Sequence, residues 1–175
     1  MIRVVLLGAI SLHILCVVQL AWRSRRARPV SYVRTAHVQA TASARWMLYT
    51  GAFLAIFIVV HLLQFTTGTI DAARFVQGAV YANLYRTFQL WYYAAFYGAA
   101  MVVLGLHLYH GAWSLFQSLG LDNPDRNRGL RGFAVLVALG LFVAFASVPA
   151  AFFSGGMKPP PDRTLASAPA GGGPR

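Results

Sequence analysis

The chain has 175 residues, of which 58% are hydrophobic and 11% charged, with 15 basic side chains against 4 acidic ones. A soluble domain carries about a quarter charged residues, and four carboxylates leave little material for acid–base catalysis. The single cysteine, Cys16, excludes an intrachain disulfide, a thiolate zinc site and an iron–sulfur cluster held by this chain alone. Because the cations lie between long apolar segments, the composition indicates an integral membrane protein and argues against nucleic-acid binding.

Four uncharged segments are each long enough to cross a bilayer, which takes roughly 20 apolar residues of helix. They predict helices over residues 3–22, 46–67, 90–117 and 132–153. The first segment also loosely fits a signal peptide, but Trp22 is followed by arginines and not by a small-residue cleavage site. We therefore expect an all-α membrane bundle of four transmembrane helices over residues 1–153. A disordered polar tail is expected over residues 154–175, which are rich in Gly and Pro.

Positive charge in short loops predicts the direction of the helices. Nine arginines lie in the 23–45 and 118–131 loops, against six cations on the opposite side (Arg3, Arg74, Arg86, Lys158, Arg163 and Arg175). The two basic loops are therefore expected in the cytoplasm of a prokaryote, with both termini outside the cytoplasmic membrane. In the outer connection, 71–89, apolar residues recur near helical spacing and predict a short interfacial helix.

Four of the five histidines lie within the predicted spans: His13, His61, His107 and His110. Ionisable residues in a bilayer are costly and usually face the bundle interior with a partner. A single such histidine is commonly explained by a hydrogen bond to a neighbouring helix. Three helices that each carry one, with no membrane Asp, Glu or Lys beside them, favour haem, because neutral imidazole is a good axial ligand for iron.

Depth predicts which histidines pair. His13 lies about 15 Å along its helix from Arg3, and His107 lies about 15 Å from Gln117. Both therefore lie close to the midplane, and we expect these two histidines to form a pair. His61 lies about 24 Å from the cytoplasmic end of its helix and has no mate at that level. His110, one turn from His107, is an alternative ligand or a group that bonds the haem edge or a quinone.

Three segments resemble the single-chain cytochrome b subunit of succinate dehydrogenases and fumarate reductases. The run from Gly105 to Gly120, with His107, His110, Gly111, Trp113 and Ser114, resembles that family's fourth helix. Residues 44–62 resemble its third helix, and Ala27-Arg28-Pro29-Val-Ser-Tyr32 resembles the loop before it. The resemblance covers roughly residues 3–150 in order, and the family's first helix, with its ligand, has no counterpart. Either a longer N-terminus supplies that helix, which we favour, or the complex uses one haem.

The resemblance implies axial ligation of the inner haem b by His13 and His107, with His61 as the outer-haem ligand lacking its mate. It implies a non-catalytic subunit that anchors a flavoprotein and an iron–sulfur protein and passes electrons to menaquinone or ubiquinone. Arg45 would be a candidate partner for a haem propionate. Two alternatives stay open: a haem b subunit of another quinone-linked oxidoreductase, and a haem-free membrane scaffold or transporter.

Overall fold

The computed structural model describes residues 1–27 and 42–161, and the polypeptide in these ranges is helical without a strand. Four of its helices are long and apolar enough to cross a membrane, which confirms the expected all-α membrane fold. They are α1 (Ile2–Arg26), α2 (Ala42–Phe65), α4 (Trp91–Ser118) and α5 (Pro124–Phe153). Most of the Ala27–Tyr32 motif and most of the polar tail lie outside the described residues.

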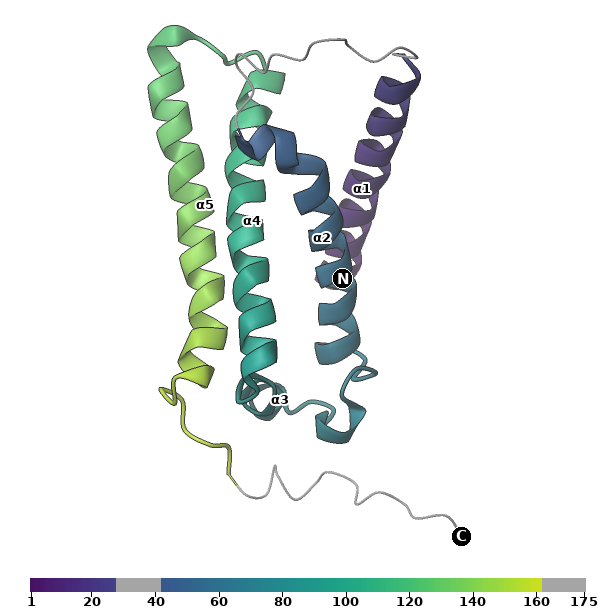
Figure 1. The fold of residues 1–175 in the computed structure, drawn as a ribbon, viewed down its shortest axis with the longest axis vertical. Helices are drawn as coiled ribbons and strands as arrows, with labels where there is room; N and C mark the ends of the chain where they lie inside the picture. Colours follow the sequence, from purple (N-terminus) through teal and green to yellow (C-terminus); the bar gives the residue numbers. More distant parts are fainter. Residues whose placement is uncertain (28–41, 162–175) are drawn as a thin grey trace. The chain divides into compact units, whose positions relative to one another are not determined.

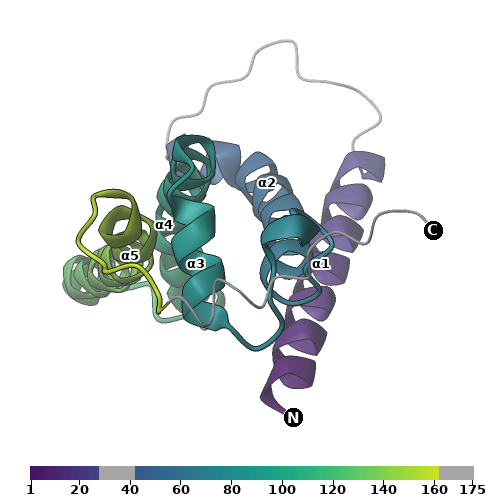
Figure 2. The same cartoon turned by 90° about the horizontal axis from the view of Figure 1, so that it is seen from below.

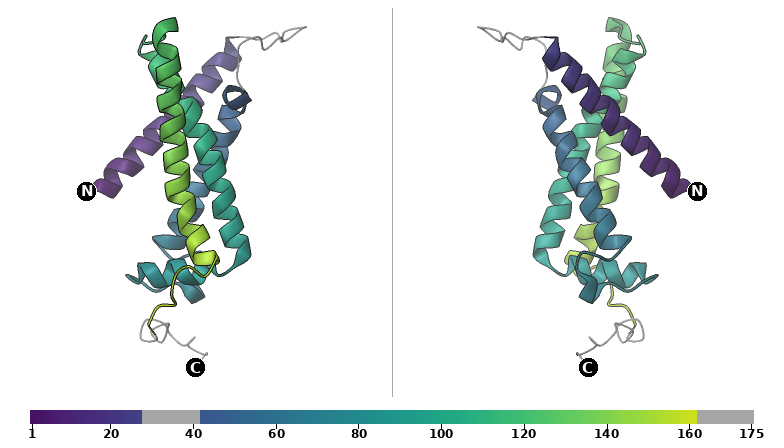
Figure 3. Two further views of the ribbon diagram at one scale, coloured as in Figure 1. Left: turned by 90° about the vertical axis from the view of Figure 1, so that its left-hand side faces the viewer. Right: turned by 90° about the vertical axis from the view of Figure 1, so that its right-hand side faces the viewer.

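The chain divides into two units, Met1–Ala40 and Thr41–Arg175, and α1 is the described part of the first. None of the residues of α1 is buried, and large apolar side chains such as Leu12 and Leu15 are exposed along it. An apolar surface of this kind is unfavourable in water and suits contact with lipid or with other membrane helices. In the second unit α4 runs between α2 and α5, and the side views show the three helices side by side (Figures 1 and 3).

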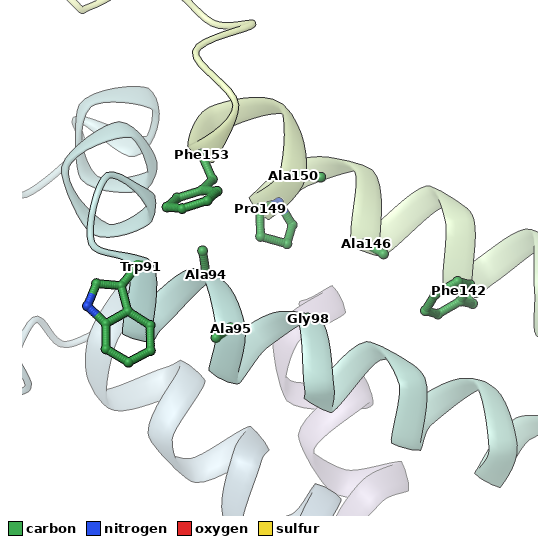
Figure 4. A pocket seen from close by; sticks show the side chains of 9 residues that line it. All are labelled: Trp91, Ala94, Ala95, Gly98, Phe142, Ala146, Pro149, Ala150 and Phe153. Carbon is green, nitrogen blue, oxygen red and sulfur yellow. The ribbon is translucent and has the colours of Figure 1, made fainter.

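Small residues bring α4 and α5 close together. Ala100 and Ala134 are fully buried, and a Cβ on Gly105 would lie in ordinary contact, 3.4 Å from Cβ of Phe142. Small side chains allow close approach of membrane helices, because lipid provides no hydrophobic force that drives them together. Nearer the end of α5, the same two helices leave an apolar groove of about 480 Å³, in which alanines and Gly98 lie between Trp91, Phe142 and Phe153 (Figure 4).

The connection between α2 and α4 folds over one end of this unit. It contains a short 3₁₀ helix, Ala72–Arg74, and the helix α3 (Val80–Phe88), which lies across the end of α4 and α5 (Figures 1 and 2). The short helix predicted in this connection is therefore present, but it begins at Val80, after Phe75 and Val76, and its position at a membrane interface stays a prediction. We call residues 66–90 the cap. The opposite end of α4 and α5, where the 119–123 turn joins them, is called the arginine end.

Aromatic side chains join the cap to the bundle. Phe88 of α3 lies 5.2 Å from Tyr97 of α4 and 6.2 Å from Phe152 of α5, measured between ring centroids. All three rings are buried. Gln89 adds a polar contact, since its Nε2 donates to the carbonyl of Phe152 at 2.8 Å. The cap is thus a packed part of the unit that fixes the ends of α4 and α5.

Candidate functional site

His107 lies on the face of α4 that meets α2 and is half-buried there. Its Nδ1 is 3.1 Å from the hydroxyl oxygen of Thr50. That hydroxyl also donates to the carbonyl of Met47 at 3.0 Å. The contact joins the ring of His107 to a side chain of the neighbouring helix, and the hydroxyl of Thr50 accepts from or donates to Nδ1 according to the tautomer of the imidazole. In the tautomer with Nδ1–H, the ring carries its lone pair on Nε2, which is the form in which a histidine binds a metal.

Gly51 makes room for the same imidazole. A Cβ at this position would lie 3.2 Å from Cε1 of His107, which is tighter than most side-chain contacts. The backbone of α2 therefore passes close to the ring, and any side chain at Gly51 would press on it. Thr50 and Gly51 together hold His107 in position from the neighbouring helix.

His61 lies in an aromatic environment further along α2. Its ring is 6.0 Å from Phe57 and 5.5 Å from Phe65, one turn to either side, and 6.1 Å from Tyr97 of α4. Part of the ring stays exposed at the surface of the unit. Packing on three aromatic rings restricts the orientation of this imidazole, as a fixed ligand requires.

His61 and His107 lie at different levels of the bundle. The partner of His107 on α2, Thr50, precedes His61 by eleven residues, or about 16 Å of helix. The two histidines therefore cannot ligate the same iron, in agreement with the depths expected from residue counts. His61 lies toward the cap, and His107 lies toward the arginine end.

His13 lies on α1, in the first unit, whereas His107 lies in the second. The pairing of His13 with His107 stays a prediction. His110 is half-buried one turn beyond His107, and Arg45 is exposed in the first turns of α2. Arg45 precedes Thr50 by five residues, about 8 Å along the helix, which places it on the arginine side of His107.

Two polar residues near His61 were not among the residues proposed from the sequence. Gln64 is 3% exposed, and its Oε1 accepts a hydrogen bond from the hydroxyl of Tyr97 at 2.8 Å. The signal available in the sequence was an amide side chain three residues after His61 in an otherwise apolar span. Tyr97 has no signal of its own in the sequence, because it lies in a segment rich in aromatic residues.

A cluster of three or more His, Cys, Asp or Glu side chains that could hold a metal ion is absent from residues 1–27 and 42–161. Haem iron takes only two axial side chains, so this finding bears on multi-ligand metal sites and not on haem. Comparison with protein-family models, with curated proteins and with solved structures finds no match for this chain.

Proposed function

We propose that this protein is the haem-binding membrane subunit of a succinate:quinone oxidoreductase, a succinate dehydrogenase or fumarate reductase. The observation that carries the proposal is the hydrogen bond, within the membrane spans, between Nδ1 of His107 and the hydroxyl of Thr50 on the neighbouring helix. Ligating histidines usually bond a fixed partner through their second ring nitrogen. The order and spacing of the segments that resemble the cytochrome b family supply the rest of the support.

The residues of the chain fit the requirements of haem b, which supplies one-electron transfer when it is bound. His107 and His13 would hold the haem nearer the arginine end, and His61 would be one ligand of a second haem nearer the cap. His110 would bond a haem edge or replace His107, and Arg45 would pair with a propionate. The apolar helices around these side chains would exclude water and set the potential of the iron.

The charges at the arginine end support the proposed partners. Arg126, Arg128 and Arg131 are exposed there, next to the end of α4. In the proposed complex this end faces the cytoplasm of a prokaryotic cell and binds the iron–sulfur and flavoprotein subunits. Menaquinone or ubiquinone in the bilayer would exchange electrons with the haem. Because exposed charges are screened by salt, binding of the partner subunits should weaken as ionic strength rises.

The first experiment is a haem count on the purified complex. A pyridine haemochrome assay, with a reduced-minus-oxidised spectrum, gives haem b per chain, and an intact mass gives the length of the subunit. One haem supports the His13–His107 pair alone, and two haems mean that another helix supplies the mate of His61. An absence of haem would contradict the proposal and leave the haem-free membrane scaffold. Quinone reduction by succinate then separates this complex from other quinone-linked oxidoreductases.

Single substitutions test which histidines bind. His107→Ala and His13→Ala should each remove the inner haem, because either change deletes an axial ligand. His110→Ala is the matched control and should leave the absorption of that haem largely intact. Loss of the haem in His110→Ala alone would show that the ligand assignment is wrong.

A further inference from the structure

Gln64 is a buried amide that uses only half of its hydrogen-bonding capacity. Its oxygen accepts from Tyr97, but among the described residues no acceptor lies within reach of its Nε2, which is buried. A buried donor without an acceptor costs about 1–3 kcal/mol relative to a satisfied one. An oxygen atom from outside the described residues would remove that cost.

The side chain of Gln64 lines a small cavity between α2 and the cap. The cavity is unusually polar for this molecule, since Asp71, Arg74, Asn83 and Thr87 also line it. Asn83 is already used within the cap: its Oδ1 accepts from Val76 N–H at 2.9 Å and its Nδ2 donates to the carbonyl of Val76 at 2.8 Å. Asp71 and Arg74 form an ion pair at 2.9 Å on the rim, where Arg74 reaches solvent.

The size of the cavity limits what it can hold. Its volume is about 10 Å³, close to the roughly 10–15 Å³ that one water molecule needs. A quinone ring or a carboxylate group does not fit this space. A buried water usually has two to four polar partners, and here they would come from Gln64 together with hydroxyl and carboxylate oxygens of the cap.

We propose that this cavity is a binding site for one ordered water molecule, which accepts a hydrogen bond from Nε2 of Gln64. The water joins the amide to the polar side chains of the cap. It thereby completes a line of polar groups that runs from the Asp71–Arg74 pair on the rim to the hydroxyl of Tyr97. The ring of Tyr97 packs against His61, so the line ends beside a histidine that we assign to the membrane interior.

Solid-state NMR of the full chain in lipid bilayers tests the proposal directly. The measurement is magnetisation transfer from water to glutamine side-chain nitrogens, in a sample labelled with ¹⁵N at Nε2, with the signal of Gln64 assigned by its loss in Gln64→Leu. The expected result is transfer to Gln64 as fast as to the exposed Gln117. The backbone amide of Ala100, which is fully buried in α4, serves as the dry reference in a second, backbone-labelled sample. Transfer to Gln64 as slow as to Ala100, or transfer from lipid protons instead of water, would overturn the proposal.

A pair of variants gives an independent test. Tyr97→Phe removes the donor to Gln64, and Gln64→Leu in that background then removes the amide itself. If the cavity holds water, the second change leaves that water without its donor, and the melting temperature falls below that of Tyr97→Phe. If the cavity is dry, the second change removes an unpaired buried amide, and the melting temperature rises, which would contradict the proposal.

Discussion

The hydroxyl of Thr50 shows how one side chain positions another. It lies 3.1 Å from Nδ1 of His107 on the neighbouring helix and so fixes the imidazole at one of its two nitrogens. Gln64 differs from His107 in this respect, because half of its amide has no partner among the described residues. In a membrane interior each polar atom needs a partner, so the few polar side chains carry most of the information about the site.

Replacing Thr50 by Val should weaken haem binding. Valine has nearly the shape of threonine but cannot hydrogen-bond Nδ1, so the imidazole would lose the bond that orients it as the proposed ligand. Loss of such a partner typically lowers metal affinity 10–100-fold, and we expect a fall of about tenfold in haem affinity together with a shift in midpoint potential. Haem titration and a redox titration of the purified complex measure both.

Thr67→Val is the matched control for this experiment. Thr67 follows the end of the same helix, and its hydroxyl donates to the carbonyl of Leu63 at 3.1 Å without touching a histidine. Haem affinity and potential should stay at the wild-type values in this variant. Equal losses in both variants would mean that Thr50 acts on the stability of α2 and not on His107.

Gly51→Val should displace His107. The first atom of the new side chain would already lie 3.2 Å from Cε1 of His107, and the branched atoms beyond it would press on the ring. Haem per chain, measured by pyridine haemochrome, should drop to less than half of the wild-type value. Gly140→Val is the control, because nothing lies within 4 Å of a Cβ at Gly140. Normal haem content in Gly51→Val would show that the ring does not need its present position.

The histidines could be found from the sequence, and the groups that hold them could not. His61 and His107 stand out because ionisable side chains are rare in apolar spans. Thr50 and Gly51 look like ordinary membrane residues, and their importance appears only when α2 packs against α4 at a particular rotation. Periodicity gives the length of a helix but not its rotation against a neighbour, so contacts between helices stayed out of reach.

At the level of the elements, the ends of the helices differ most from the sequence-based ranges. The helix expected from residue 132 begins at Pro124, because Asn123 caps it by accepting from the backbone N–H of Asp125 at 2.9 Å. Proline in the first turn also favours a helix start here. Counting apolar residues marks where a helix enters the hydrocarbon, whereas capping residues mark where the helix itself begins. The same difference extends α1 through its arginines to Arg26.

Asn83→Leu should loosen the cap. Asn83 is 7% exposed and bonds both the N–H and the carbonyl of Val76, so leucine would leave two backbone groups unpaired. Each buried unpaired group costs about 1–3 kcal/mol, enough to open the 66–79 segment in a measurable fraction of molecules. Limited proteolysis should show new cleavage in this segment, while Tyr81→Phe, which removes only the exposed bond to the carbonyl of Lys158, should not. Protection equal to wild type in Asn83→Leu would contradict this role.

For the whole molecule, the charges at the two ends of the bundle bear on its direction in the membrane. The arginine end carries Arg126, Arg128 and Arg131, the last with its guanidinium 4.7 Å above the ring of Trp113. The cap holds Arg74 against Asp71, a contact that raises the pKa of the arginine and offsets its charge. An excess of arginine in short loops is typical of the cytoplasmic side of a membrane protein.

We expect the arginine end to face the cytoplasm and the cap to face outside. In a Cys16→Ser background, single cysteines in place of Gln77 in the cap and Asp122 at the arginine end report the two sides, since both positions are exposed. A membrane-impermeant maleimide should label Gln77→Cys in intact spheroplasts and Asp122→Cys only after lysis. The reverse pattern would overturn the orientation and, with it, the side on which the partner subunits bind.

Removing charge from one loop tests whether the arginines cause this orientation. Changing Arg126, Arg128 and Arg131 to Gln leaves six of the nine cations in the basic loops, equal to the six on the opposite side. Because the excess of Lys and Arg in short loops sets the direction, this variant should insert in both orientations, and a fraction of Asp122→Cys should become labelled in intact spheroplasts. Changing the three cations Arg74, Arg86 and Lys158 to Gln is the matched control and should keep the single orientation. An unchanged pattern in the first variant would mean that the charge of this loop does not fix the direction of the chain.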